Sequence, residues 1–297
     1  MPVDLRHHQV ELRLPSPLVE LRDERFDERQ VRVWLKRDDL IHPELPGNKW
    51  RKLKYNLAAA AEQGHQTLLT FGGAYSNHIR ATAAAGHYFG FSTVGVIRGE
   101  EHLPLNPSLA YAVERGMRLT YLDRATYRAK REPAVLDELR REWGDFYLVP
   151  EGGSNGLGAQ GCSEIPAEVD LDFDVMCCPV GTGGTLAGII GGLRPGQAAL
   201  GFSVLKGATS LDHEVTDLQA AAFGTAPVCA WRIEHGFHFG GYAKKTSELQ
   251  DFIDDFADRH DITLDRIYTA KMMFGIVTLT QDGYFPASTR LVAVITG

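Results

Sequence analysis

The sequence predicts an α/β protein of two lobes, each built on a parallel twisted sheet with flanking helices. Short apolar runs alternate with helical patterns along all 297 residues, and this is the order of elements in parallel-sheet proteins. Several runs lack polar alternation, as expected for strands that are covered on both faces. The runs are also too numerous for one small sheet. The predicted strands cover 31–36, 67–71, 93–97, 119–123, 146–150, 175–180, 199–205 and 291–296.

The order of these strands suggests how the chain divides. Residues 58–150 contain four of the runs with helical stretches between them, and we predict that they form a small domain. Residues 1–57 and 151–297 then form a large domain. Ligands of open α/β sheets bind at the carboxyl ends of the strands, so we expect the site in a cleft between the two lobes.

Two helical patterns are clear. Between 247 and 259, apolar residues recur at the i, i+3, i+4, i+7 and i+8 positions, which is the spacing of one helix face. Ser247 and Gln250 have the spacing of a capping box at its start. A second pattern runs from about 50 to 63 and ends at Gly64, a common residue just beyond a helix.

Composition and charge exclude several classes of protein. The chain is 44% hydrophobic and 23% charged, whereas disordered chains are poorer in apolar residues. Its net charge of −7 argues against a nucleic-acid surface, which needs clustered positive charge. No apolar run approaches the roughly 18 residues of a membrane span, and the first residues lack the apolar core of a signal peptide. We therefore expect a cytoplasmic protein that binds neither nucleic acid nor membrane.

Cysteine and metal-ligand patterns point to no redox or metal chemistry. The cysteines at 162, 177, 178 and 229 form no CxxC pair, and we interpret them as packing thiols. No HExxH or similar spacing is present, so no metal is predicted. By contrast, the 31 glycines exceed the average for globular proteins. They cluster at the ends of strand-like runs, which indicates close approach of the backbone to a ligand.

Lys49 is the candidate nucleophile. Asn48 is a good helix cap, which puts Lys49 at the first helical position. A cation there opposes the positive end of the helix dipole, and a lysine whose pKa is lowered attacks carbonyls more readily. Spacing alone favours a simpler interpretation, in which Lys49 shares a solvated basic face with Arg51, Lys52 and Lys54.

A glycine-rich loop directly follows the predicted strand 175–180. A strand, a glycine loop and a helix in this order bind phosphate through backbone N–H groups and the helix dipole. The loop is not a nucleoside-triphosphate P-loop, and Leu186 stands where the dinucleotide motif has its last glycine. A small phosphate-bearing ligand remains, and the alternative is a tight turn without a ligand. The predicted phosphate contacts are Gly181, Thr182, Gly183, Gly184 and Thr185.

Ser76 and Asn77 lie at the start of an alanine-rich helix that follows the strand 67–71. The free N–H groups there can accept an anion such as a carboxylate, although both residues are equally good as ordinary helix caps. We assign His78 no role. An amine nucleophile, a phosphate cradle and a carboxylate cradle are together what pyridoxal phosphate (PLP) needs to act on an amino acid.

Motifs in a fixed order along nearly the whole chain support that combination. The sequence resembles the PLP enzymes of the 1-aminocyclopropane-1-carboxylate deaminase and D-cysteine desulfhydrase family, which have the tryptophan synthase β-like fold (fold type II). The resemblance implies PLP as cofactor, a small amino acid as substrate and a homodimer. It rests on Leu35–Asp39, Gly47–Leu53, Gly152–Gly158, Asp265–Lys271 and the final Thr296 and Gly297.

The resemblance also implies a role for each matching residue. Lys49 is then the Schiff-base lysine, and Lys52 is the other lysine of the motif without that role. Ser76 lies near the substrate carboxylate, and Asn77 binds the phenolic oxygen of the cofactor. Tyr268 and Tyr242 face the substrate. The loop 181–185 binds the phosphate, and Thr269 and Thr296 lie near the pyridine nitrogen.

Departures from the family pattern bear on the substrate. Thr269 stands where the deaminase has a glutamate, and a threonine does not hold the pyridine nitrogen protonated. Tyr75 replaces the usual glutamine before Ser76. We therefore expect desulfhydrase-like α,β-elimination to pyruvate, ammonia and sulfide. The alternatives are ring opening of 1-aminocyclopropane-1-carboxylate to 2-oxobutanoate and ammonia, and a non-catalytic binder of PLP or another phosphorylated ligand.

Overall fold

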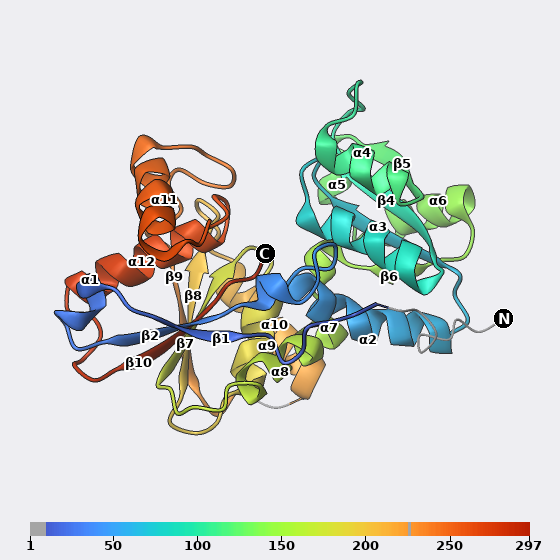
Figure 1. Ribbon diagram of the computed structural model, residues 1–297. Coiled ribbons are helices and arrows are strands. Elements are labelled where there is room, and N and C mark those ends of the chain that lie inside the picture. The colour runs from blue at the N-terminus through green and yellow to red at the C-terminus, as the bar shows by residue number, and fades with distance from the viewer. Residues whose placement is uncertain (1–9, 225–226) are drawn as a thin grey trace. The chain divides into compact units, whose positions relative to one another are not determined.

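The computed structural model describes residues 10–224 and 227–297 (Figure 1). Its residues divide into two compact units, and each unit has its own sheet. The first unit contains 49–154 together with 10–12, and the second contains 13–48 and 155–297. The first unit thus includes the whole range 58–150 of the small domain proposed from the sequence, and in addition 49–57 and 151–154. The predicted domain boundaries stay a prediction.

The first unit is built on a four-stranded sheet in the order β5-β4-β3-β6. All neighbouring strands are parallel, so each connection must cross over the sheet, and helices make these crossovers. The strands are β3 (Thr67–Gly72), β4 (Ser92–Arg98), β5 (Met117–Leu122) and β6 (Tyr147–Val149). The helices are α2 (Asn48–Glu62), α3 (Asn77–Phe89), α4 (Pro107–Glu114), α5 (Arg124–Arg128) and α6 (Pro133–Trp143), with a short turn η2 (Glu151–Gly153).

Alternation along the strands assigns these helices to the two faces of the sheet. Leu69, Phe71 and Val94 pack in one cluster with side chains from α5 and α6. Ile97 packs in another cluster with side chains from α3 and α4. Helices therefore cover both faces of β3 and β4, which explains why these strands are apolar without alternation.

The second unit is built on a six-stranded sheet in the order β1-β2-β10-β7-β8-β9. Only β1 runs antiparallel to its neighbour. The strands are β1 (Leu18–Leu21), β2 (Arg32–Lys36), β7 (Val175–Val180), β8 (Ala198–Ser203), β9 (Ala230–Glu234) and β10 (Arg290–Val294). A short turn, η1 (Asp38–Leu40), follows β2. The parallel α/β fold predicted from the sequence is confirmed.

Helices cover both faces of this sheet as well (Figure 1). Alternate residues of β2 point to opposite faces of the sheet. Val33 and Leu35 pack into the hydrophobic cluster on one face, and Trp34 packs into the cluster on the other face. The first face carries α1 (Glu24–Asp27), α11 (Ser247–His260) and α12 (Thr269–Gln281). The second carries α7 (Gly156–Cys162), α8 (Glu164–Ala167), α9 (Gly184–Gly192) and α10 (Leu211–Phe223).

Two details differ from the sequence prediction. The helix that starts near 247 is capped by Thr246, whose hydroxyl accepts from the N–H of Leu249, so the capping box at Ser247 was wrong. The strands β1 and β9 were not predicted. The four cysteines are free and buried, as predicted. Within 10–224 and 227–297, no helix combines the length and apolar character needed to cross a membrane.

Asp23 joins the first helix of this unit to α11. Its carboxylate caps α1 by accepting from the Arg25 N–H (3.0 Å) and also accepts from Arg25 Nε (2.8 Å). His260 Nε2 lies 2.9 Å from the other carboxylate oxygen. Burial raises the pKa of Asp23, but the Arg25 hydrogen bonds outweigh burial and hold that pKa at about 2, below its ordinary 3.8.

This lowered pKa predicts how stability depends on pH. A carboxylate whose folded-state pKa lies below its unfolded value stabilises the fold above about pH 4, and the effect is lost as pH falls toward 2. Asp23→Asn should therefore lower the free energy of unfolding at pH 6 by about 1–3 kcal/mol through lost charged hydrogen bonds. The difference from the unmodified protein should shrink between pH 4 and pH 2.5 in urea titrations. A difference independent of pH would contradict the assignment, and Asp27→Asn, at an exposed site of the same helix, is the control.

Candidate functional site

The glycine loop between β7 and α9 has the conformation of a phosphate-binding turn. Gly183 caps the helix in a left-handed conformation (φ +79°), and as a glycine it makes no side-chain hydrogen bond to the first N–H groups of α9. A Cβ atom at Gly183 would lie 3.0 Å from Val215 Cγ2, so a larger residue would crowd α10. The nine-residue helix thus begins with N–H groups that its own cap residue does not engage. Such groups are the donors that an anion binds.

Two further segments meet this loop. Thr185 Oγ1 accepts a hydrogen bond from Asn48 Nδ2 (2.9 Å), and both side chains are buried. The preceding residue, Gly47, has φ +55°, and a Cβ atom there would lie 1.9 Å from the carbonyl oxygen of Thr296. Only glycine fits that contact. The structure therefore brings together three segments that are far apart in the sequence, at Gly47 and Asn48, at Thr185 and at Thr296.

Lys49 is the next residue in the chain. Helix α2 begins at Asn48, one residue earlier than predicted, so Lys49 is its second residue. Lys49, Arg51 and Lys52 are 9%, 1% and 4% exposed. The interpretation of this segment as a solvated basic face is therefore wrong. Buried cations are retained where they have specific partners.

Lys52 is bound to the turn η2 of its own unit. Its ammonium donates to the carbonyl of Gly152 (3.1 Å) and to Ser154 Oγ (3.3 Å). Gly153 lies against the same side chain in a left-handed conformation (φ +65°), where a Cβ atom would lie 3.1 Å from Lys52 Cβ. Lys52 thus anchors the glycine motif that follows β6.

Ser76 and Asn77 begin α3, as predicted. Ser76 is the cap, and its Oγ accepts from the N–H of Ile79 at 3.3 Å. Ser76 therefore does act as an ordinary helix cap. Because its oxygen is the acceptor in that bond, its hydroxyl hydrogen can still be donated to another group. Asn77 is the first residue of the helix, and both side chains are partly exposed.

His78 is the second residue of α3 and is buried. Thr70 Oγ1 donates to the carbonyl of Val149 (2.8 Å), so at its 2.8 Å contact with His78 Nε2 it must accept, and we place the ring hydrogen on Nε2. Nδ1 has no hydrogen-bond partner in the described part of the chain. Burial, with the charges of Lys49 and Lys52, lowers the pKa of His78 to about 3. His78 is therefore neutral at physiological pH.

The start of α12 presents Tyr268 to the glycine loop of its own unit. The Asp265 carboxylate accepts from the N–H groups of Ile267 (3.0 Å), Tyr268 (2.8 Å) and Thr269 (2.8 Å). These bonds hold the turn in which Tyr268 lies. A Cβ atom at Gly181 would lie 3.3 Å from Tyr268 Cε1, so the ring lies against the loop.

Tyr242 and Thr269 lie beside Tyr268. The Tyr268 and Tyr242 hydroxyls are 3.4 Å apart, and the two rings meet edge to face with centroids 6.0 Å apart. The buried Thr269 hydroxyl donates to Asp265 Oδ2 at 2.6 Å. Because a hydroxyl has one hydrogen, Thr269 can only accept from any further group. Asp265 opens the motif 265–271 that the sequence analysis identified, but its role was not predicted, although an acidic residue just before a helix is a capping signal.

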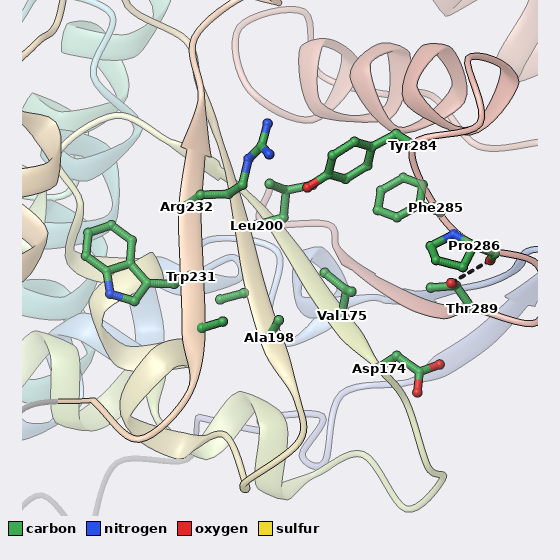
Figure 2. A pocket seen from close by; sticks show the side chains of 12 residues that line it. Asp174, Val175, Ala198, Leu200, Trp231, Arg232, Tyr284, Phe285, Pro286 and Thr289 are labelled. Atoms are coloured by element: carbon green, nitrogen blue, oxygen red, sulfur yellow. Dashed lines mark hydrogen bonds between the residues drawn. The ribbon is translucent and has the colours of Figure 1, made fainter.

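A cavity of about 470 Å³ lies elsewhere in the second unit, at the amino ends of β7, β8 and β9 (Figure 2). The Arg232 guanidinium lies 4.9 Å from the centre of the Tyr284 ring and pairs with Glu234. Asp174 is bonded to Arg290. The Arg232 and Asp174 side chains at this cavity therefore already have protein partners. The cavity also lies at the opposite end of these strands from the glycine loop.

Comparison with known proteins supports a cofactor at the glycine loop. The family model described as pyridoxal-phosphate dependent enzyme matches residues 11–297. The chain belongs to this family. The N–H groups at the start of α9, which Gly183 leaves without a side-chain cap, fit the phosphate of PLP. The predictions of PLP as cofactor and of a PLP-dependent enzyme are confirmed.

Similar proteins include both members of the pair named from the sequence. A putative 1-aminocyclopropane-1-carboxylate deaminase of Pyrococcus horikoshii is 31% identical over 84% of this chain and 80% of its own. A bifunctional D-cysteine desulfhydrase/1-aminocyclopropane-1-carboxylate deaminase, mitochondrial, of Arabidopsis thaliana is 32% identical over 84% and 68%. A D-cysteine desulfhydrase of Yersinia pestis is 32% identical over 89% and 86%.

A solved structure agrees with this relationship. The structure of an ACC deaminase homologue has a TM-score of 0.82 and 27% identity, covering 98% of this chain and 91% of that one. An O-ureido-L-serine synthase, with a TM-score of 0.65 and 16% identity over 95% and 88%, shares the fold. The predicted fold type II, and the resemblance to the deaminase and desulfhydrase family of lyases, are confirmed.

The contact between Gly47 and Thr296 makes a quantitative prediction. Gly47→Ala adds a Cβ atom that overlaps a backbone carbonyl and imposes a left-handed conformation on alanine. The free energy of unfolding should fall by about 3 kcal/mol or more, which combines strain and a steric clash. Gly207→Ala is the matched control, since its φ is +69° but no atom lies within 4 Å, and it should cost about 1 kcal/mol. Equal losses in urea denaturation would contradict the close approach.

Proposed function

We propose that this chain is a PLP-dependent lyase that carries out D-cysteine desulfhydrase-like α,β-elimination on a small amino acid. In the overall reaction, the Cα–H, Cβ–S and Cα–N bonds of cysteine break and the oxygen of one water becomes the 2-oxo group, which gives pyruvate, ammonia and sulfide. Bound PLP supplies the electron sink for the negative charge that develops at Cα. The relatives named desulfhydrase and deaminase support this class of reaction.

The observation that carries the proposal is the bond between Asn48 and Thr185. It fixes the residue that precedes Lys49 to the loop whose N–H groups suit a phosphate. A cofactor with an aldehyde and a phosphate requires both an amine nucleophile and a phosphate site. We assign to Lys49 the covalent attachment of the cofactor and the removal of the Cα proton.

The other predicted site residues take supporting roles in the proposal. Ser76 donates its hydroxyl to the substrate carboxylate, and Asn77 donates to the phenolic oxygen of the cofactor. Tyr242 and Tyr268 face the substrate. The phosphate is held by the loop Gly181, Thr182, Gly183, Gly184 and Thr185, and Thr269 and Thr296 lie near the pyridine nitrogen.

Thr269 favours elimination over ring opening. Its hydroxyl hydrogen is given to Asp265, so it offers the pyridine nitrogen neither a negative charge nor a hydrogen. A carboxylate at this position would hold the nitrogen protonated and strengthen the electron sink. Sulfide is a good leaving group and demands less of that sink than the breaking of a carbon–carbon bond does.

We also propose a homodimer in the cytoplasm. The family resemblance implies the dimer, and light scattering of the purified protein tests it against the 32.8 kDa monomer. The four buried, free cysteines are typical of a reducing compartment, and fractionation of cells that produce the protein tests the location.

A substrate panel tests the function. The purified holoenzyme is incubated with D-cysteine, L-cysteine, D-serine and 1-aminocyclopropane-1-carboxylate, and sulfide, ammonia and 2-oxo acid are measured. We expect D-cysteine to give the three products in equal amounts, and Lys49→Ala to reduce turnover to background because the amine is lost. Turnover of the cyclopropane substrate alone would favour ring opening. No turnover despite bound PLP would favour a non-catalytic binder, and full activity of Lys49→Ala would contradict the mechanism.

A further inference from the structure

The segment that carries Tyr242 has a strained backbone. Phe239, Gly240, Gly241 and Ala243 have φ values of +49°, +85°, +122° and +56°. Residues with side chains rarely adopt positive φ, and two of these four have side chains. Such strain persists only where surrounding groups hold the segment, and it is concentrated at functional sites.

A buried lysine holds this segment. Lys271, in the first turn of α12, is fully buried, and its ammonium donates to the carbonyls of His238 (2.9 Å) and Gly241 (2.8 Å). The carbonyl of Val204, just beyond β8, is 3.5 Å away. These three acceptors match the three hydrogens of an ammonium. The bonds to His238 and Gly241 span the strained residues Phe239 and Gly240.

The arrangement links the two tyrosines. Tyr268 immediately precedes α12 and Lys271 lies three residues later, so one helix start carries both. Lys271 bonds to the carbonyl of Gly241, and the next residue, Tyr242, has its hydroxyl 3.4 Å from that of Tyr268. The position of Tyr242 relative to Tyr268 therefore depends on the bonds of Lys271.

We propose that Lys271 is a positioning residue that holds the strained turn 238–243 and thereby places the Tyr242 hydroxyl beside Tyr268. The inference rests on the proposed function only in that Tyr242 faces the substrate. Burial lowers the pKa of Lys271, and the Asp265 carboxylate opposes that effect. An ammonium kept at the cost of burial needs a full set of acceptors, which the turn provides.

A second buried lysine provides a matched control. Lys36, on β2 of the same unit, is also fully buried. Its ammonium bonds to Glu168 Oε2 and to the carbonyl of Ser16, each at 2.7 Å. Lys36→Met therefore removes a buried ammonium from the same unit without removing a bond to the turn 238–243.

Limited proteolysis tests the turn without cofactor or activity. Lys244 and Lys245 are exposed and follow the turn directly, so trypsin cleavage there reports its local opening. Each protein is digested at the same interval below its own melting temperature, and the cleaved peptides are quantified by mass spectrometry. Lys271→Met should accelerate cleavage at 244–245 by at least about tenfold over the unmodified protein, because the loss of even one hydrogen bond of a charged group shifts an opening equilibrium by about that factor.

Lys36→Met should leave this rate within about twofold of the unmodified protein, because opening of the turn does not depend on Lys36. Equal cleavage in Lys271→Met and the unmodified protein would overturn the inference. If Lys271→Met does not fold, Lys271→Gln, which has no charge and a shorter side chain, takes its place, and unchanged cleavage in that variant has the same consequence.

A double-mutant cycle tests the link to Tyr242. With D-cysteine, Lys271→Met should lower kcat/KM by about tenfold or more, and Tyr242→Phe should also lower it. Added to Tyr242→Phe, Lys271→Met should cost less than about twofold, because the hydroxyl that it positions is already gone. If the loss of kcat/KM in the double variant equals the product of the losses in the two single variants, the proposed positioning role of Lys271 is overturned. If the unmodified enzyme has no activity, the proposed function fails, and proteolysis still decides whether Lys271 holds the turn.

Discussion

The contact on which the site depends is the close approach of Gly47 to the Thr296 carbonyl. A left-handed residue without a side chain lets the segment before α2 pass against the end of β10. Asn48 can then reach Thr185, at the start of the helix behind the glycine loop. Lys49 is the next residue along the chain. The two residues that precede the proposed nucleophile are therefore fixed within the second unit by these two contacts.

A second group of polar contacts organises the start of α12. Asp265 accepts from three backbone N–H groups and from Thr269, and Lys271 donates to carbonyls of the turn 238–243. Asp265 and Lys271 both form hydrogen bonds with backbone groups through a charged side chain, and such hydrogen bonds are stronger than those between neutral groups. Tyr268 and Tyr242 owe their positions to these two residues. The tyrosines are thus placed by buried charges that need not themselves touch substrate.

Much of this arrangement could be predicted from the sequence. The central strands are apolar because helices cover both faces, so runs such as 67–71 and 175–180 were identified within about one residue of their bounds. The strands β1 and β9 were missed because they lie at the edges of the sheet. Most residues of each are partly or fully exposed, so they give no continuous apolar run.

The candidate site was less fully predictable. Motifs identified Lys49, the glycine loop and the start of α3, because glycine clusters and helix starts are local features. The contacts that join them are between distant residues and have no local pattern. Lys271 lies in the motif Asp265–Lys271, but the motif gave it no role, because its acceptors are backbone carbonyls, which any sequence contains. The burial of Lys49, Arg51 and Lys52 reversed the interpretation that spacing alone had favoured.

The central claim is that the chain holds PLP through Lys49. The most direct test is to add PLP to the purified protein and to reduce the carbon–nitrogen double bond between lysine and cofactor with sodium borohydride. The pyridoxyl group is then located by peptide mass spectrometry. Trp50 and Arg51 separate Lys49 from Lys52, so fragmentation distinguishes the two lysines. The account predicts one pyridoxyl group per chain, on Lys49, and none in Lys49→Ala. Modification of Lys52 instead, or of no lysine in the segment 47–53, would contradict it.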